Sequence, residues 1–160
     1  MAENIQKIAA EELISIQVIN SIDYSFSTGP IMGKWFQGLK EKKFYATKCP
    51  SCGRTMTPPR GCCALCVVRS EDFVEVGPKG TVVNYDIAYY ASPDPLTGKV
   101  RKTPYSALFV MLDGSARDIF AHEIKDDDIP KLKRGVRVRP VWNEVRTGSI
   151  HDLLYFEIDG

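Results

Sequence analysis

Residues 49–66 read CPSCGRTMTPPRGCCALC and contain all five cysteines of the chain. Two residues separate Cys49 from Cys52, and Cys63 and Cys66 repeat that spacing after ten intervening residues. Each pair predicts a tight turn that directs two sulfurs at one centre, and Gly53 allows the chain to turn with positive φ. Two converging pairs give a tetrahedral four-thiolate site, the arrangement typical of structural zinc.

The sequence alone leaves open which cysteines bind the metal and which metal is bound. Cys62 would leave three residues before Cys66, so we predict that Cys63 is the ligand because it keeps the spacing of the first pair. Iron also accepts four thiolates in a rubredoxin-like centre, and four unrelated buried cysteines are a third possibility. If zinc is bound, four sulfurs leave no open position for substrate or water, and the metal is expected to be structural.

The composition places limits on the class of protein. Apolar residues make up 44% of the 160 residues, enough for a folded core. The formal charge of +1 gives no global attraction to nucleic acid or to an anionic membrane. No run reaches the roughly 18 apolar residues of a membrane span, and residues 1–12 lack the pattern of a secretory signal. We therefore expect a cytoplasmic protein whose thiols are free or bound to metal.

The segment before the cysteines predicts little regular structure at first and then a helix. A short helix over residues 2–12 is weakly indicated, and the alternation over residues 14–18 is typical of an extended segment. A stronger helix follows, because Pro30 suits a first turn and Trp35 and Leu39 recur at helical spacing. Residues 1–44 are therefore predicted to form an N-terminal extended segment and helix.

The rest of the chain predicts a zinc ribbon over residues 45–76 and a β-barrel over residues 77–160. Residues 81–90, 105–112 and 153–158 are rich in strand-forming residues, and Asp113-Gly114 is a hairpin signal. About five short strands in this length favour a small antiparallel barrel of the OB type. The predicted fold class is thus mainly β with an N-terminal helix: a rubredoxin-like zinc ribbon followed by an OB-fold barrel.

The order of these features resembles a known family. The chain has Trp35 before the first cysteine pair, Pro58-Pro59-Arg60 between the pairs, and Leu112-Asp113-Gly114 after a central strand. In this order the features resemble the zinc-ribbon/OB-fold proteins associated with acyl-CoA enzymes, formerly a domain of unknown function. Two departures are Ala64, where a proline is often found, and the additional thiol of Cys62.

The resemblance implies a function that the spacing of the cysteines does not give. Members of this family are usually non-catalytic partners of a thiolase, of 3-hydroxy-3-methylglutaryl-CoA (HMG-CoA) synthase or of an enoyl-CoA hydratase. It implies an accessory or scaffold protein that bridges or assists such enzymes, with structural Zn²⁺ and with CoA or acyl-CoA as a potential ligand. The partner enzyme and the acyl chain stay open.

Basic residues are the candidates for contacts with CoA phosphates. A guanidinium binds oxyanions in a bidentate manner, and alternate arginines on one strand share a face. Ordinary solvated or ion-paired side chains are the competing interpretation for each of them. The candidates are Arg60, Lys79, Arg101, Lys102, Arg137 and Arg139.

A module that binds single-stranded nucleic acid is the alternative function, since OB barrels and zinc ribbons both serve it elsewhere. Residues 77–160 contain 12 basic and 12 acidic side chains, and this neutral balance argues against it. No catalytic residues are predicted. His122 and His151 lie beside no serine or cysteine in the sequence, and Cys62 has no neighbouring base.

Overall fold

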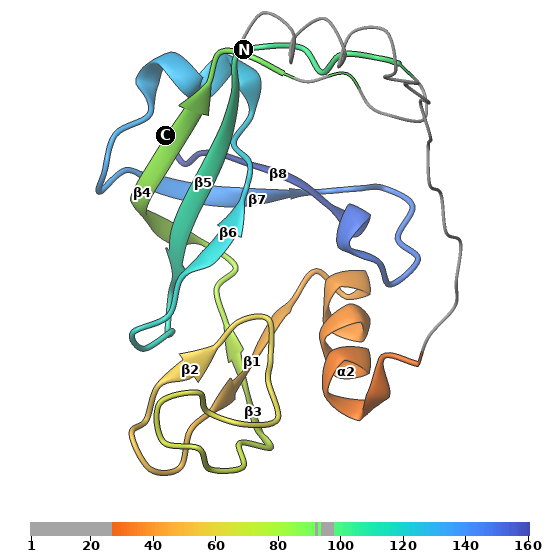
Figure 1. Cartoon of the computed structure of the whole chain (residues 1–160), viewed down its shortest axis with the longest axis vertical. Coiled ribbons are helices and arrows are strands. Elements are labelled where there is room, and N and C mark those ends of the chain that lie inside the picture. Colours follow the sequence, from red (N-terminus) through yellow and green to blue (C-terminus); the bar gives the residue numbers. More distant parts are fainter. Residues whose placement is uncertain (1–26, 92, 94–97) are drawn as a thin grey trace, which may run out of the picture.

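The computed structural model describes residues 27–91, 93 and 98–160. The helix predicted over residues 2–12 and the extended segment over residues 14–18 lie outside these ranges. The described part contains the helix α2 (Gly29–Lys40) and two antiparallel sheets, one of three strands and one of five (Figure 1). The predicted fold class, mainly β with a helix near the N-terminus, is confirmed.

Helix α2 forms where the sequence predicts it. Pro30 lies in its first turn, where the fixed φ of proline suits the helix and its missing N–H is not needed. Trp35 and Leu39 are four residues apart and share one face, and both are almost fully buried. In Figure 1 the helix lies beside the three-stranded sheet and below the end of the barrel, so its buried face contacts both.

The three-stranded sheet belongs to the ribbon. Strand β1 (Phe44–Lys48) lies in the centre, between β2 (Thr55–Met56) and β3 (Asp72–Val76). Both neighbours are antiparallel to β1, and β3 pairs along its whole length, from Phe44 opposite Val76 to Lys48 opposite Asp72. Because β1 ends at Lys48, the first cysteine follows directly at the end of the sheet.

The five-stranded sheet closes into a barrel. Its strands are β4 (Gly80–Ala88), β5 (Tyr105–Leu112), β6 (Phe120–His122), β7 (Arg137–Trp142) and β8 (Leu153–Ile158), in the order β6-β5-β4-β7-β8. The two outer strands meet through a parallel bridge between Ile124 and Phe156. The Lys125 N–H donates to the Phe156 carbonyl, and the Phe156 N–H donates to the Glu123 carbonyl, each at 2.8 Å. Five strands closed in this way form a barrel of the OB type.

The loop between β5 and β6 differs from the prediction. The hairpin signal at Asp113-Gly114 predicts a tight turn, but β6 begins only at Phe120, and Ala116 and Arg117 bond to the ribbon instead of the sheet. The Thr55 N–H donates to the Ala116 carbonyl (3.1 Å), and the Ala116 N–H donates to the Thr55 hydroxyl (2.9 Å). Arg117 has a φ of +54° and donates to the Cys52 carbonyl. This loop therefore fastens the barrel to the metal-binding turn.

One hydrophobic core joins the helix, the ribbon and the barrel. Phe44 of β1 is fully buried at its centre, and its ring centroid lies 5.7 Å from Trp35, 5.6 Å from Phe120 and 5.0 Å from Trp142. Aromatic rings at such separations stabilise one another beyond the burial of their area. The division of the chain into residues 1–44, 45–76 and 77–160 stays a prediction.

Gly80 shows how tightly β4 packs in the barrel. A Cβ at this position would lie 2.3 Å from Val110 Cγ1 and 2.7 Å from the Met111 carbonyl oxygen. We expect Gly80→Ala to lower the free energy of unfolding by about 1–3 kcal/mol, because neighbouring backbone must move. Gly33→Ala in α2 is the control, since a Cβ there meets only Thr28 Oγ1 at 3.5 Å. Equal stability of the two variants in urea unfolding would contradict this packing.

Asp152 stabilises the turn before β8. It is buried, and its carboxylate oxygens accept hydrogen bonds from the N–H groups of Thr147 (3.0 Å) and Gly148 (2.8 Å). Burial raises the pKa of the Asp152 carboxyl, but these N–H groups, together with that of Ser149, outweigh burial and hold the pKa below its ordinary value of 3.8.

This carboxylate gives a pH-dependent contribution to stability. A carboxyl whose folded pKa is lowered contributes fully above its ordinary pKa and loses that contribution as the pH falls through the lowered value. We expect Asp152→Asn to cost about 1–3 kcal/mol at pH 7, because an amide NH₂ would replace an acceptor, and to cost less near pH 2. Urea unfolding of both proteins at the two pH values measures the difference, and a cost that does not change with pH would contradict the prediction.

Candidate metal centre

The first cysteine pair lies on a tight turn at the end of β1. The Gly53 N–H donates to the Cys49 carbonyl at 3.0 Å, and Gly53 has the predicted positive φ, +71°. The Cys52 N–H donates to the Cys49 sulfur at 3.5 Å and lowers the pKa of that thiol to about 6. An N–H directed at a sulfur favours the thiolate, which is the form that binds metal.

The second pair repeats this turn without a glycine. The Val67 N–H donates to the Cys63 carbonyl at 2.8 Å, as Gly53 does to Cys49 in the first turn. Val67 also follows the second cysteine of its pair and has a φ of +54°. Because a β-branched residue is strained in this region, the second turn holds a conformation that its own sequence disfavours.

The two turns bring four sulfurs together. The sulfurs of Cys49, Cys52, Cys63 and Cys66 all lie within 4.8 Å of one another. Cys62 is exposed and is not part of this cluster. Hydrogen bonding with Cys52 raises the pKa of the Cys66 thiol to about 11, since sulfurs this close cannot all ionise without a cation. The donor set and its arrangement therefore fit a four-thiolate metal, and they support a structural zinc.

Hydrogen bonds to strand β1 hold the segment between the two cysteine turns. Thr47 of β1 is fully buried, and its hydroxyl donates to the Arg60 carbonyl (2.8 Å) and accepts from the Arg60 N–H (2.9 Å). The backbone at Arg60 is thus fixed to the central strand of the ribbon. The Arg60 side chain remains exposed at the surface.

Three of the six basic residues proposed for CoA contacts, Lys79, Arg137 and Arg139, lie near Asp159 and lower the pKa of its carboxyl. Arg137 illustrates their usual setting: its guanidinium binds Asp113 and lowers the pKa of that carboxyl. Within the described ranges no ion pair involves Arg60 or Lys102. The other four form the pairs Lys79–Asp159 (2.6 Å), Arg101–Glu123 (2.5 Å), Arg137–Asp113 (2.5 Å) and Arg139–Glu157 (2.8 Å). Contact with CoA stays a prediction for all six.

The fold brings both histidines to one open cavity of about 380 Å³, together with Glu123. This proximity could not be predicted from local sequence, because His122 and His151 are 29 positions apart. Burial lowers the pKa of His122, and its Nε2 lies 3.2 Å from the Leu153 carbonyl oxygen. Among the residues that the structure describes, no serine or cysteine lines this cavity.

A smaller cavity of about 150 Å³ lies where the ribbon meets the loop of residues 113–119. Three of the side chains that line it, Arg54, Thr57 and Asp118, were not singled out by the sequence. Asp118 is more than 60 positions from the other two, and only the contact between the loop and the ribbon brings it to them.

No helix in the described ranges is both long and apolar enough to cross a membrane.

Comparison with known proteins gives a consistent result. Residues 36–73 match the family described as the ChsH2 rubredoxin-like zinc ribbon domain. No curated protein matches the sequence. A DUF35-family protein of unknown function from Sulfolobus solfataricus has a similar structure, with 23% identity and a TM-score of 0.60 over 82% of this chain and 87% of that chain.

The second similar structure is described as the Ltp2-ChsH2(DUF35) aldolase. The matched chain is 22% identical, with a TM-score of 0.58 over 84% of this chain and 98% of that chain. At 22–23% identity, the two structural matches establish a shared fold. The protein thus carries a ChsH2-type zinc ribbon in a chain with the fold of the DUF35 zinc-ribbon proteins, as the resemblance in the sequence indicated.

Proposed function

We propose that this chain is a non-catalytic accessory subunit of an acyl-CoA enzyme complex, which bridges or assists a thiolase, an HMG-CoA synthase or an enoyl-CoA hydratase. The observation that carries the proposal is the likeness over 98% of a chain from a structure described as an Ltp2-ChsH2(DUF35) aldolase. Because this chain shares the fold of nearly the whole of that chain, the likeness supports a role in an assembly of the same kind.

The metal centre supports an accessory role. Four cysteine sulfurs surround one position, so a bound zinc has no site left for substrate or water. Zinc bound in this way holds the ribbon together and supplies no Lewis acid or nucleophile. Among the described residues, the lining of the cavity that contains both histidines has no serine or cysteine to form a Ser–His or Cys–His pair.

The second cysteine turn supports docking of a partner protein. Leu65 and Val67 of this turn are 68% and 79% exposed, and neighbouring exposed apolar side chains are a feature of protein-binding surfaces. An exposed apolar turn is explained if another protein covers it.

Contact with CoA is proposed at Arg60 and Lys102. These two side chains have no acidic partner among the described residues, whereas acids neutralise the other four candidates. A phosphate would therefore displace no ion pair at either position. A chain that holds an acyl-CoA intermediate between two enzymes keeps it at an effective concentration of about millimolar, which favours the next step.

Binding to single-stranded nucleic acid is not favoured. The barrel arginines Arg137 and Arg139 bind Asp113 and Glu157, so the strand face they share presents no uncompensated positive charge. A phosphate backbone is bound through such charge. A gel shift that weakens with added salt would be needed to revive this alternative.

Affinity purification from native cells tests the proposal. We expect the tagged full-length chain to recover an acyl-CoA enzyme of the thiolase, synthase or hydratase type, identified by mass spectrometry. Leu65→Asp is expected to reduce that recovery about tenfold, because a charge in an apolar interface must be desolvated. Val145→Asp, at an equally exposed site outside the metal-binding turns, is the matched control. Recovery of no acyl-CoA enzyme by the unaltered chain would refute the proposal.

A further inference from the structure

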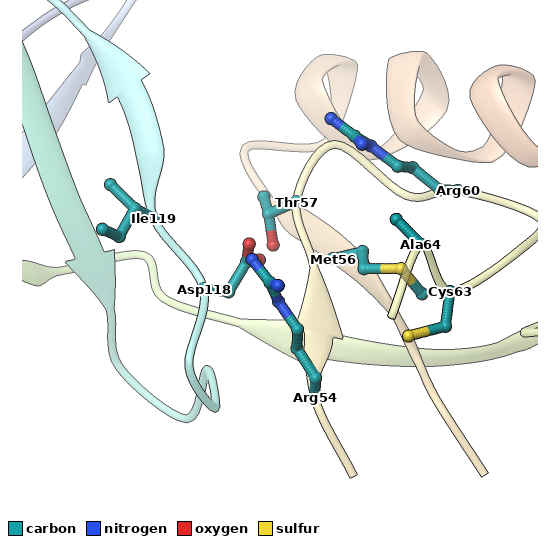
Figure 2. A pocket seen from close by; sticks show the side chains of 8 residues that line it. All are labelled: Arg54, Met56, Thr57, Arg60, Cys63, Ala64, Asp118 and Ile119. Atoms are coloured by element: carbon teal, nitrogen blue, oxygen red, sulfur yellow. The ribbon is translucent and has the colours of Figure 1, made fainter. Parts of the chain in front are cut away.

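The cavity of about 150 Å³ between the ribbon and the loop of residues 113–119 has an unusual lining. Three buried side-chain polar atoms of the described residues have no hydrogen-bond partner: Arg54 Nε, Thr57 Oγ1 and Asp118 Oδ2. All three residues line this one cavity, and Figure 2 shows their side chains directed toward one another. Because buried polar groups are almost always satisfied in folded proteins, three such atoms at one place call for a polar partner inside the cavity.

Two of these side chains are buried in the fold, and Arg54 is half-buried. Thr57 and Asp118 are each only 8% exposed. Asp118 is fixed by its neighbours, since Ala116 exchanges hydrogen bonds with Thr55 and Arg117 donates to the Cys52 carbonyl. Arg117 adopts its positive φ next to this position, and backbone strain of this kind is concentrated at functional sites.

The three atoms define the chemistry of a ligand. Arg54 Nε can only donate, the Asp118 carboxylate can only accept, and the Thr57 hydroxyl can do either. A carboxylate ligand would satisfy Arg54 but would face the negative charge of Asp118. An ammonium group would satisfy Asp118 but would face Arg54. A primary carboxamide is neutral and carries both N–H donors and a carbonyl acceptor, so it meets all three requirements.

We infer that this cavity binds a carboxamide group. Its NH₂ donates to Asp118 Oδ2, and its carbonyl oxygen accepts from Arg54 Nε and from the Thr57 hydroxyl. The cavity has room for a group of several heavy atoms, since a single water needs only about 10–15 Å³ of such volume. The group is either a free small amide or the side chain of an asparagine or glutamine in a docked chain. This inference goes beyond the proposed function and does not depend on an acyl-CoA partner.

A titration of the zinc-loaded full chain, followed by backbone amide NMR, tests the inference. The probes are propionamide, propionate and propylammonium, which have similar size and differ in donors and acceptors. We expect propionamide to shift signals of residues 54–57 and 118–119 in a saturable manner, with a Kd on the order of 1–10 mM. We expect at least tenfold weaker binding of the two charged probes.

Variants separate the site from nonspecific effects. Thr57→Val should weaken propionamide binding several-fold, Thr57→Ser should restore it, and Asp127→Asn on the exposed surface should leave it unchanged. N-acetylglutamine methylamide separates the two sources. Its binding supports a docked side chain, whereas binding of propionamide alone supports a free amide. Tighter binding of either charged probe than of propionamide would overturn the inference. So would a cavity that still contains ordered water and no amide when propionamide is present at 50 mM.

Discussion

Replacement of Cys63 by serine is expected to release the metal and to unfold the ribbon. Cys63 is buried, and its sulfur lies 3.9 Å from that of Cys52 within the four-sulfur cluster. Mutation of residues that hydrogen-bond to metal ligands lowers metal affinity by roughly 10–100-fold. Loss of Cys63, which is itself a ligand, should lower zinc affinity by more than this. Because metal binding in such ribbons is coupled to folding, thermal stability should fall with it. Metal analysis and thermal unfolding measure both effects, and the unaltered chain should contain one zinc and no iron.

Cys62→Ser is the matched control for this prediction. Cys62 is adjacent in sequence and identical in chemistry, but it is exposed and outside the cluster. We expect it to keep full zinc content and stability. If Cys62→Ser lost the metal and Cys63→Ser retained it, the ligand of the second turn would be Cys62 and not Cys63.

Phe44→Ala is expected to lower the free energy of unfolding by about 3–5 kcal/mol, because it leaves a large cavity in the core. Phe44 belongs to the ribbon strand β1, yet its ring packs against Phe120 of the barrel and Trp35 of α2. Its loss should therefore weaken all three segments together, with a decrease in Tm of roughly 10 °C or more. Calorimetry should show one transition in the unaltered chain.

Phe73→Ala separates this packing from a general effect of removing an aromatic ring. Phe73 lies on the neighbouring strand β3 and is 37% exposed. Its substitution should cost less than half as much as that of Phe44. Equal costs for the two variants would mean that the ribbon and the barrel do not share a core.

Much of this architecture could be predicted from local sequence. The spacing of the cysteine pairs indicates two identical turns, and Gly53 marks the position that needs positive φ. Pro30 and the spacing of Trp35 and Leu39 predict α2, and the strand-forming run of residues 105–112 coincides with β5. These features depend on residues within one turn or one strand of each other, which is the range over which periodicity and turn chemistry act.

Features that depend on contacts between distant segments could not be predicted. The loop of residues 113–119 carries a hairpin signal at Asp113-Gly114, and nothing in its own residues indicates that Ala116 pairs with Thr55 of the ribbon. Val67 has a positive φ that its residue type disfavours, so the second turn is imposed by the cluster of sulfurs. The partners of Lys79 and Arg137 are likewise set by the barrel, which brings Asp159 and Asp113 to them.

We propose that this chain assists an acyl-CoA enzyme and performs no chemistry of its own. Turnover of acyl-CoA by the purified chain, by its co-purifying enzyme and by the two together tests this claim directly. We predict no turnover by the chain alone, and turnover by the pair at least tenfold above that of the enzyme alone. If the chain still turned over acyl-CoA after the co-purifying enzyme had been removed completely, a non-catalytic role would be contradicted.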